Sequence, residues 1–192
     1  MKRLILALII LVSAVYLLVP FGNTFTPLDL SKLSSAQQSQ LDLATASKAA
    51  LGKELVSTLT AKMQADGPLA AIDLCNTQAL PLTAKIAAQQ GVLIGRTSFR
   101  LRNPENASPQ WAAATVAAES QDMQAFAGSD GSLSVLYPIM TEAKCLVCHS
   151  AKENMASAVL AELEAKYVTD EAFGFSEGAL RGYFWVEVGA QN

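Results

Sequence analysis

The sequence has 192 residues, of which 51% are hydrophobic and 16% are charged, and its net charge is −3. Without Lys2 and Arg3, the chain has 12 basic and 17 acidic side chains, which gives a net charge near −5. This balance argues against a protein that binds nucleic acid or an anionic membrane surface. The length suits a single domain with one core.

The first segment predicts export. Residues 4–21 carry no charge, and at ~1.5 Å per residue they would form a helix of roughly 27 Å, just long enough to cross a bilayer. Lys2 and Arg3 favour an N-terminus on the inner side. We therefore predict an N-terminal membrane anchor or signal segment at residues 1–22, with the domain on the periplasmic side of the bacterial inner membrane. An anchor is favoured because residues 20–25 form a poor cleavage site; cleavage would instead leave a soluble periplasmic protein.

A tether and a long helix follow. Residues 23–34 are expected to form the tether, and residues 35–192 the domain. Residues 36–65 lack proline and place apolar side chains at four-residue spacing, which predicts an amphipathic helix that ends at Gly67–Pro68. Packing on the core is its simplest role; the alternatives are dimerisation or continuation from the anchor. The spaced side chains are Leu51, Leu55, Leu59 and Met63.

Pro68 is well placed to begin a second helix. Cys75 lies on an apolar face of this helix and is predicted to point toward the core. A lone cysteine in such a place is usually a small buried apolar side chain. Pro81 is expected to interrupt the helix, and residues 82–90 to restart it. The apolar face consists of Leu69, Ile72, Cys75 and Ala79.

The alternation of side chains predicts a strand at residues 92–102, with Arg96, Arg100 and Arg102 on one face. A solvent-exposed strand face is the simplest interpretation of the three arginines.

The second half of the chain predicts a mixture of helices and strands. Residues 103–106 indicate a turn, and a helix is expected from Ser108 to about Phe126. A strand at 133–139 follows, then a helix at 155–166 and a closing strand at 182–188. This order predicts an α+β fold.

Cys145–His149 reads Cys-x-x-Cys-His, the attachment motif of c-type haem. Two thiols three positions apart can add to the two vinyl groups of one haem, and the adjacent imidazole then becomes an iron ligand. His149 is the only histidine in the chain. We therefore predict one covalent haem c held by Cys145 and Cys148, with His149 on the iron, in a fold unlike that of the small all-helical cytochromes c.

Other interpretations of the motif are weaker. A zinc site would need two further ligands, and Cys75 is the only other cysteine or histidine. A redox-active Cys-x-x-Cys pair usually belongs to a β-α-β unit, which this sequence does not indicate.

Two contacts of the haem remain to be assigned. The sixth position of the iron can be taken by Cys75, by a methionine or by water, or it can stay open. Arg96 is the preferred partner of the haem propionates, because arginine binds carboxylates in a bidentate fork. The candidate methionines are Met63, Met123, Met140 and Met155.

Several segments, in this order, resemble one family: the bacterial c-type haem domain of unassigned function, with a PAS-like fold and His/Cys iron ligation. The resemblance spans roughly residues 40–188, and the ordered set of segments is more specific than any one of them except the haem motif. Ser150 departs from the glycine that the family commonly has after the histidine. The matching segments are Ala71–Cys75, Gly95–Ser98, Arg102–Asn106, Tyr137–Ile139, Cys145–His149, Asp170–Phe175, Gly178 and Arg181–Gly182.

The resemblance implies a PAS-like antiparallel sheet with flanking helices, and Cys75 as the distal ligand opposite His149. A metal cation deprotonates a bound thiol, and an anionic sulfur gives a lower reduction potential than the methionine of His/Met cytochromes. On reduction the bond to Cys75 is expected to weaken, which would open a position for a small gas.

Two functions fit these expectations. The first is a redox or gas sensor that signals to a partner protein; the second is a membrane-tethered electron-transfer cytochrome with ligands fixed in both redox states. An enzyme such as a peroxidase is less well supported, because it would need a distal acid or base and the only histidine is already committed. The expected partners are an unidentified redox or signalling protein, a small gas ligand and a second copy of the chain.

Overall fold

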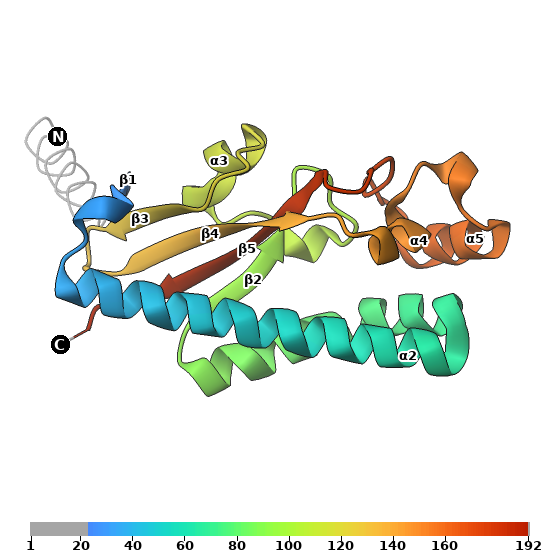
Figure 1. Cartoon of the computed structure of the whole chain (residues 1–192), viewed down its shortest axis with the longest axis horizontal. Coiled ribbons are helices and arrows are strands. Elements are labelled where there is room, and N and C mark those ends of the chain that lie inside the picture. The colour runs from blue at the N-terminus through green and yellow to red at the C-terminus, as the bar shows by residue number, and fades with distance from the viewer. Residues whose placement is uncertain (1–22, 192) are drawn as a thin grey trace, which may run out of the picture.

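The sheet is the centre of the fold. The computed structural model describes residues 23–191, and its five strands form one antiparallel sheet in the order β1-β3-β4-β5-β2. The last strand therefore lies inside the sheet, between β4 and β2 (Figure 1). The strands are β1 (Phe25–Pro27), β2 (Leu93–Thr97), β3 (Gln124–Gly128), β4 (Leu133–Met140) and β5 (Leu180–Val188).

The long helix α2 (Ser35–Gln90) consists of two straight parts that meet at Gly67. Gly67 has φ 82° and ψ −179°, a conformation that is essentially restricted to glycine. Figure 1 shows the second part running back beside the first, and an ion pair between Lys85 and Glu54 joins the two parts at 3.3 Å. The predicted end of the first helix at Gly67–Pro68 is thus confirmed.

The two faces of the sheet are covered by different elements. Helix α2 packs on one face, where Leu51 and Ile86 contact the cluster around Val135 and Val186. The short helix α3 (Ala113–Ala117) covers the other face. The predicted strand at 182–188 is confirmed as part of β5, and its side chains alternate between the two faces: Tyr183 belongs to the α3 side and Val186 to the α2 side.

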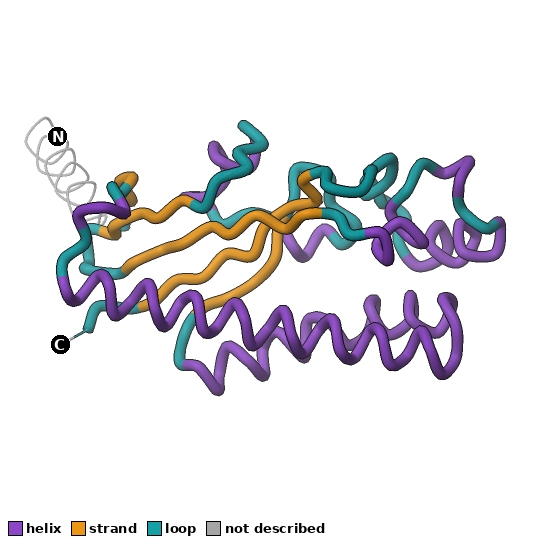
Figure 2. The backbone as a smooth tube through the Cα atoms, viewed as in Figure 1, coloured by secondary structure: helices purple, strands orange, loops and turns teal. Residues whose placement is uncertain are grey.

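The segment between β4 and β5 forms its own layer at one end of the molecule. Figure 2 shows this segment, made of short helices and loops, beyond the ends of the strands. It contains α4 (Leu146–His149) and α5 (Ser157–Lys166). Helix α5 packs on the second part of α2, and Lys166 binds Asp73 at 2.7 Å. Single turns of 3₁₀ helix occur at Leu30–Lys32, Pro104–Asn106, Gln110–Ala112, Ala143–Cys145 and Lys152–Asn154.

Three predicted boundaries are wrong. Pro81 does not interrupt α2, because buried neighbours such as Thr83 hold the helix in place across it. The strand predicted at 92–102 ends at Thr97, since Ser98 turns the chain by accepting a hydrogen bond from the Arg100 amide at 3.0 Å.

The third wrong boundary is that of the helix predicted from Ser108 to Phe126. It ends at Ala117, where Glu119 adopts φ 52°, and residues 124–128 form strand β3 instead. The turn at 129–132 pairs this strand with β4, so a hairpin replaces the second half of the expected helix.

The sequence predictions for the class of fold are confirmed: the domain is α+β, with an antiparallel sheet and a long helix. The finer PAS-like assignment stays a prediction. Residues 23–34, predicted to be a tether, supply the edge strand β1. Within residues 23–191 no helix is long and apolar enough to cross a membrane, and the predicted anchor at 4–21 lies outside the described residues.

Candidate haem site

The cysteines of the motif lie on one turn of helix. Strand β4 leads through a 3₁₀ turn into α4, where Cys145 is the N-cap residue and Cys148 and His149 form the last two positions. Residues three apart lie on the same side of a helix, so both thiols can face one group. Cys75, Cys145 and Cys148 are all free and partly buried.

His149 is fixed in one orientation. Its Nδ1 lies 2.9 Å from the carbonyl oxygen of Ala172. A carbonyl only accepts hydrogen bonds, so Nδ1 carries the proton and Nε2 presents a lone pair. Metal-binding histidines typically have this arrangement, in which a hydrogen bond to one ring nitrogen orients the other toward the metal. The ring of Phe175 stands edge-on to the imidazole at 6.2 Å.

The imidazole is also kept neutral. Burial lowers the pKa of His149 well below its usual value of 6.5, and the nearby charges of Arg181 and Arg102 lower it further. A neutral imidazole is the form that binds a metal.

The segment 170–175 runs alongside α4 and supplies most of these contacts. Besides the Ala172 carbonyl, the amide of Phe175 donates to the carbonyl of His149, and the amide of Gly174 donates to that of Ser150, both at 2.9 Å. This segment is one of those that carry the family resemblance, and its position explains why it accompanies the haem motif.

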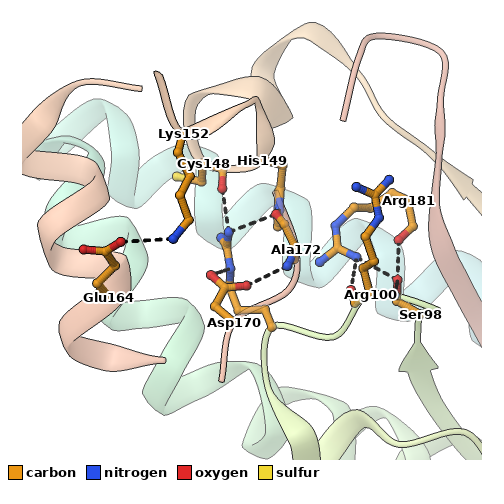
Figure 3. Close-up of polar contacts among 10 residues, drawn as sticks. Ser98, Arg100, Cys148, His149, Lys152, Glu164, Asp170, Ala172 and Arg181 are labelled. Carbon is orange, nitrogen blue, oxygen red and sulfur yellow. Dashed lines mark hydrogen bonds and ion pairs between the residues drawn. The ribbon is translucent and has the colours of Figure 1, made fainter. Parts of the chain in front are cut away.

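A buried ion pair holds this segment against α4. Arg102 Nε donates to Asp170 at 2.8 Å, and the side chains are only 12% and 3% exposed. Arg102 also donates to the carbonyl of Cys148 at 2.6 Å and to that of Ala172 at 3.3 Å. The other oxygen of Asp170 accepts from the Ala172 amide at 2.8 Å (Figure 3). The ion pair therefore fixes both the haem motif and the carbonyl that orients His149.

The other arginines near the motif have no such partner. Arg102–Asp170 is the only ion pair between an arginine and a carboxylate in residues 23–191. Arg96 has a buried Nε with no hydrogen-bond partner. Arg100 donates to the Phe173 carbonyl at 2.6 Å, and Arg181 donates to the Ser98 hydroxyl at 3.1 Å. Arg100 and Arg102 lie in the loop after β2, so the predicted row of three arginines on one strand is wrong.

Cys75 lies in the same neighbourhood. Burial raises its pKa, while the charges of Arg96 and Arg102 lower it. Ile72, about one turn earlier on the same helix, packs in one cluster with Cys148 and Tyr167. The fold therefore brings Cys75 near the motif, 70 residues further along the chain. Its role as a ligand stays a prediction.

Of the four candidate methionines, Met155 packs with Cys148 against the cluster formed by α5 and the second part of α2. Met123 and Met140 are 37% and 39% exposed, and Met63 is partly buried on α2.

The sequence assigned no role to Asp170, Ala172 or Arg181. A carbonyl acceptor carries no side-chain signal, and neither Asp170 nor Arg181 belongs to a periodic pattern. Their only sequence signal is membership in the segments that carry the family resemblance.

The residues present fit a haem. Two thiols lie on one helical turn, the Nε2 of a neutral imidazole lies next to them, and buried guanidinium groups without carboxylate partners match the acidic side groups of the cofactor.

Comparisons with known proteins show the family and a shared fold. A model of the Tll0287-like family matches residues 30–189 of the chain. Among solved structures, the chain is similar to one described as the crystal structure of the cyanobacterial heme-protein Tll0287, with a TM-score of 0.60 and 20% sequence identity. The similarity covers 80% of this chain and 98% of that chain, and it shows a shared fold. No curated protein matches.

The ion pair predicts a large effect of Asp170→Asn. The substitution leaves the Arg102 charge buried without its partner, which typically costs about 3–5 kcal/mol. We expect the free energy of unfolding, measured by urea denaturation of the protein made without haem, to fall by that amount. Asp73→Asn is the matched control, because it breaks the exposed pair with Lys166 and should cost less than about 1 kcal/mol. Equal effects of the two substitutions would contradict the role given to the ion pair.

His149 predicts a pH dependence of stability without haem. Its folded pKa is lowered below 6.5, so the unfolded state binds more protons as the pH falls below that value. The contribution of His149 to the free energy of unfolding is thus fully present above pH 6.5. Below that pH it decreases, by up to about 1.4 kcal/mol per pH unit. His149→Asn, which can still donate to Ala172, should remove this part of the slope. Because there is no other histidine, parallel curves for the two proteins between pH 7 and 5 would show that the imidazole is not buried as described.

Proposed function

Since this chain belongs to the Tll0287-like family, we propose that it is a mono-haem c-type cytochrome domain. In this proposal Cys145 and Cys148 hold the haem through two thioether bonds, and His149 Nε2 is a ligand of the iron. The observation that carries the proposal is the fixed, neutral imidazole beside two free thiols on the same helical turn. The finer PAS-like assignment belongs to the proposal too, and the antiparallel sheet with helices on both faces supports it.

Cys75 is the proposed second iron ligand. It comes from the second part of α2, whose Ile72 packs in the same cluster as Cys148. Its thiol is partly buried and free. Met155 is the alternative, because it packs in the same cluster as Cys148.

The proposed role is that of a redox or gas sensor. When bound, the haem supplies a one-electron couple and a position for a small gas. Cys75 lies on the second part of α2, and α2 also packs across the sheet through Leu51 and Ile86. A change in the ligation of the iron by Cys75 would thus be transmitted through α2 to the sheet, and from the sheet to a partner protein. A carrier of electrons, the alternative, needs no such link.

Export is part of the same proposal. Haem c is attached on the outer side of the bacterial inner membrane, so the domain belongs in the periplasm, tethered by residues 4–21 or released by cleavage.

Attachment of haem tests the central proposal. Made together with the haem-attachment machinery, the chain should carry one covalent haem, measured by mass spectrometry and by the pyridine haemochrome spectrum. Cys145→Ser and Cys148→Ser should each remove one thioether bond and lower the amount of holoprotein several-fold, because one thiol anchors the group less firmly. Cys75→Ser is the control and should retain both bonds. Full covalent haem in both motif variants would refute the proposal.

Carbon monoxide separates a sensor from a carrier. If Cys75 is a ligand that leaves on reduction, the ferrous protein should bind carbon monoxide, and Cys75→Ala should change the ferric absorption spectrum. Met155→Leu should leave that spectrum as it is. An unchanged ferric spectrum in Cys75→Ala would exclude Cys75 as the ligand, and a ferrous spectrum that carbon monoxide does not alter would favour the electron carrier.

A further inference from the structure

The site carries more positive charge than its own residues balance. Arg102 donates to the carbonyl of Cys148, and the guanidinium groups of Arg100 and Arg181 lie 4.0 and 5.0 Å from the centre of the Phe175 ring, which stands edge-on to His149. Arg96 lies near the end of β2 that leads into this site. Asp170 is the only carboxylate paired with any of them among residues 23–191. Buried charges are normally paired, so this excess indicates a ligand with negative charge.

Two of the four arginines are already engaged. Arg102 is held by Asp170 and by two backbone carbonyls. Arg100 donates to the Phe173 carbonyl at 2.6 Å, and its guanidinium lies 4.0 Å from the centre of the Phe175 ring. Neither arginine offers its full set of donors to a ligand.

Arg96 and Arg181 remain. The Nε of Arg96 is buried without a partner. Arg181 has only neutral acceptors, the Ser98 hydroxyl at 3.1 Å and the Arg100 carbonyl at 3.4 Å. Desolvation by burial is the main reason that the pKa of Arg181 falls to about 10, and the charges of Arg102 and Arg96 lower it further. Neither guanidinium group therefore has a carboxylate partner among residues 23–191.

Their position relates them to His149. The guanidinium of Arg181 lies 5.0 Å from the centre of the Phe175 ring, which stands edge-on to the imidazole. Figure 3 shows Arg181 and Arg100 together on one side of His149, with Asp170 and Lys152 on the other. Strand β2 carries Arg96 and the neighbouring strand β5 carries Arg181, so the two residues are held by the rigid sheet rather than by a loop.

We propose that Arg181, together with Arg96, forms the receptor for the two carboxylates of the haem. This inference rests on the proposed function, because it names the residues that hold the acidic side of the same cofactor. Arginine suits this role because its fork of donors matches the two oxygens of a carboxylate. The thioether bonds hold one edge of the haem, and the two arginines hold the carboxylate edge.

The test uses two measurements that respond in opposite directions. In the protein without haem, Arg181→Met and Arg96→Met should each increase the free energy of unfolding, because a buried charge without a carboxylate partner is removed. In the holoprotein, each variant should keep its covalent haem and show a lower reduction potential, since a positive charge favours the reduced state. We expect at least a tenfold change in the ratio of ferric to ferrous protein at a fixed potential, which corresponds to 59 mV.

Arg181→Lys is the conservative variant. It keeps the positive charge but loses the paired N–H donors of the guanidinium. The reduction potential of this holoprotein should therefore lie between those of the original chain and Arg181→Met. Lys85→Met removes an exposed positive charge that is paired with Glu54 and should leave the potential unchanged.

The outcomes are distinct. Holoprotein whose potential does not change in Arg181→Met and Arg96→Met would overturn the receptor while leaving the haem proposal intact. Failure of the original chain to attach haem would overturn both. Succinate is a probe for a free dicarboxylate: if it stabilises the haem-free protein through these arginines while the potential of the holoprotein is unchanged, the site binds a free anion and its assignment to the haem is wrong.

Discussion

The ion pair between Arg102 and Asp170 is the contact on which the site depends. It joins the loop after β2 to the segment before β5. Arg102 also donates to the carbonyls of Cys148 and Ala172, and Asp170 also accepts from the Ala172 amide. The orientation of His149 follows from it, because the imidazole donates to the Ala172 carbonyl. A buried ion pair adds little net stability compared with apolar residues, but it specifies one geometry. The chain uses that specificity to fix a ligand of the proposed iron.

The rest of the fold serves to bring four distant segments together. Strands β2 and β5 are neighbours, so the residues that follow one and precede the other meet at the same end of the sheet. The long connection between β4 and β5 places α4 at that end, and the return of α2 at Gly67 brings the part of the helix that carries Cys75 there as well. Each segment alone is short and irregular, and the rigid sheet and helix beneath them supply the precision that a cofactor site needs.

The sequence predicts the parts of this arrangement that have a local cause. The end of the first helix at Gly67–Pro68, the strand near 133–139 and the last helix near 155–166 follow from turn residues and periodicity, and the structure agrees. The errors have a tertiary cause: Pro81 is tolerated because buried neighbours such as Thr83 hold the helix in place across it, and residues 124–128 form a strand because a hairpin partner is available. The contacts of Asp170 and Arg181 were not predictable, since they join residues about 70 to 80 positions apart. The haem motif was recognisable because its chemistry requires a fixed spacing.

The place of β5 inside the sheet has a consequence for how the molecule forms. Strand β2 cannot join β4 directly, because β5 lies between them. Residues 93–97 therefore have no neighbouring strand to pair with until residues 180–188 are available. Pairings of such large sequence separation form slowly. The Cys-x-x-Cys-His turn likewise gains its contacts with Arg102 and Ala172 only when β5 joins the sheet. Until then its two thiols and its imidazole belong to an open chain that an attachment enzyme can reach.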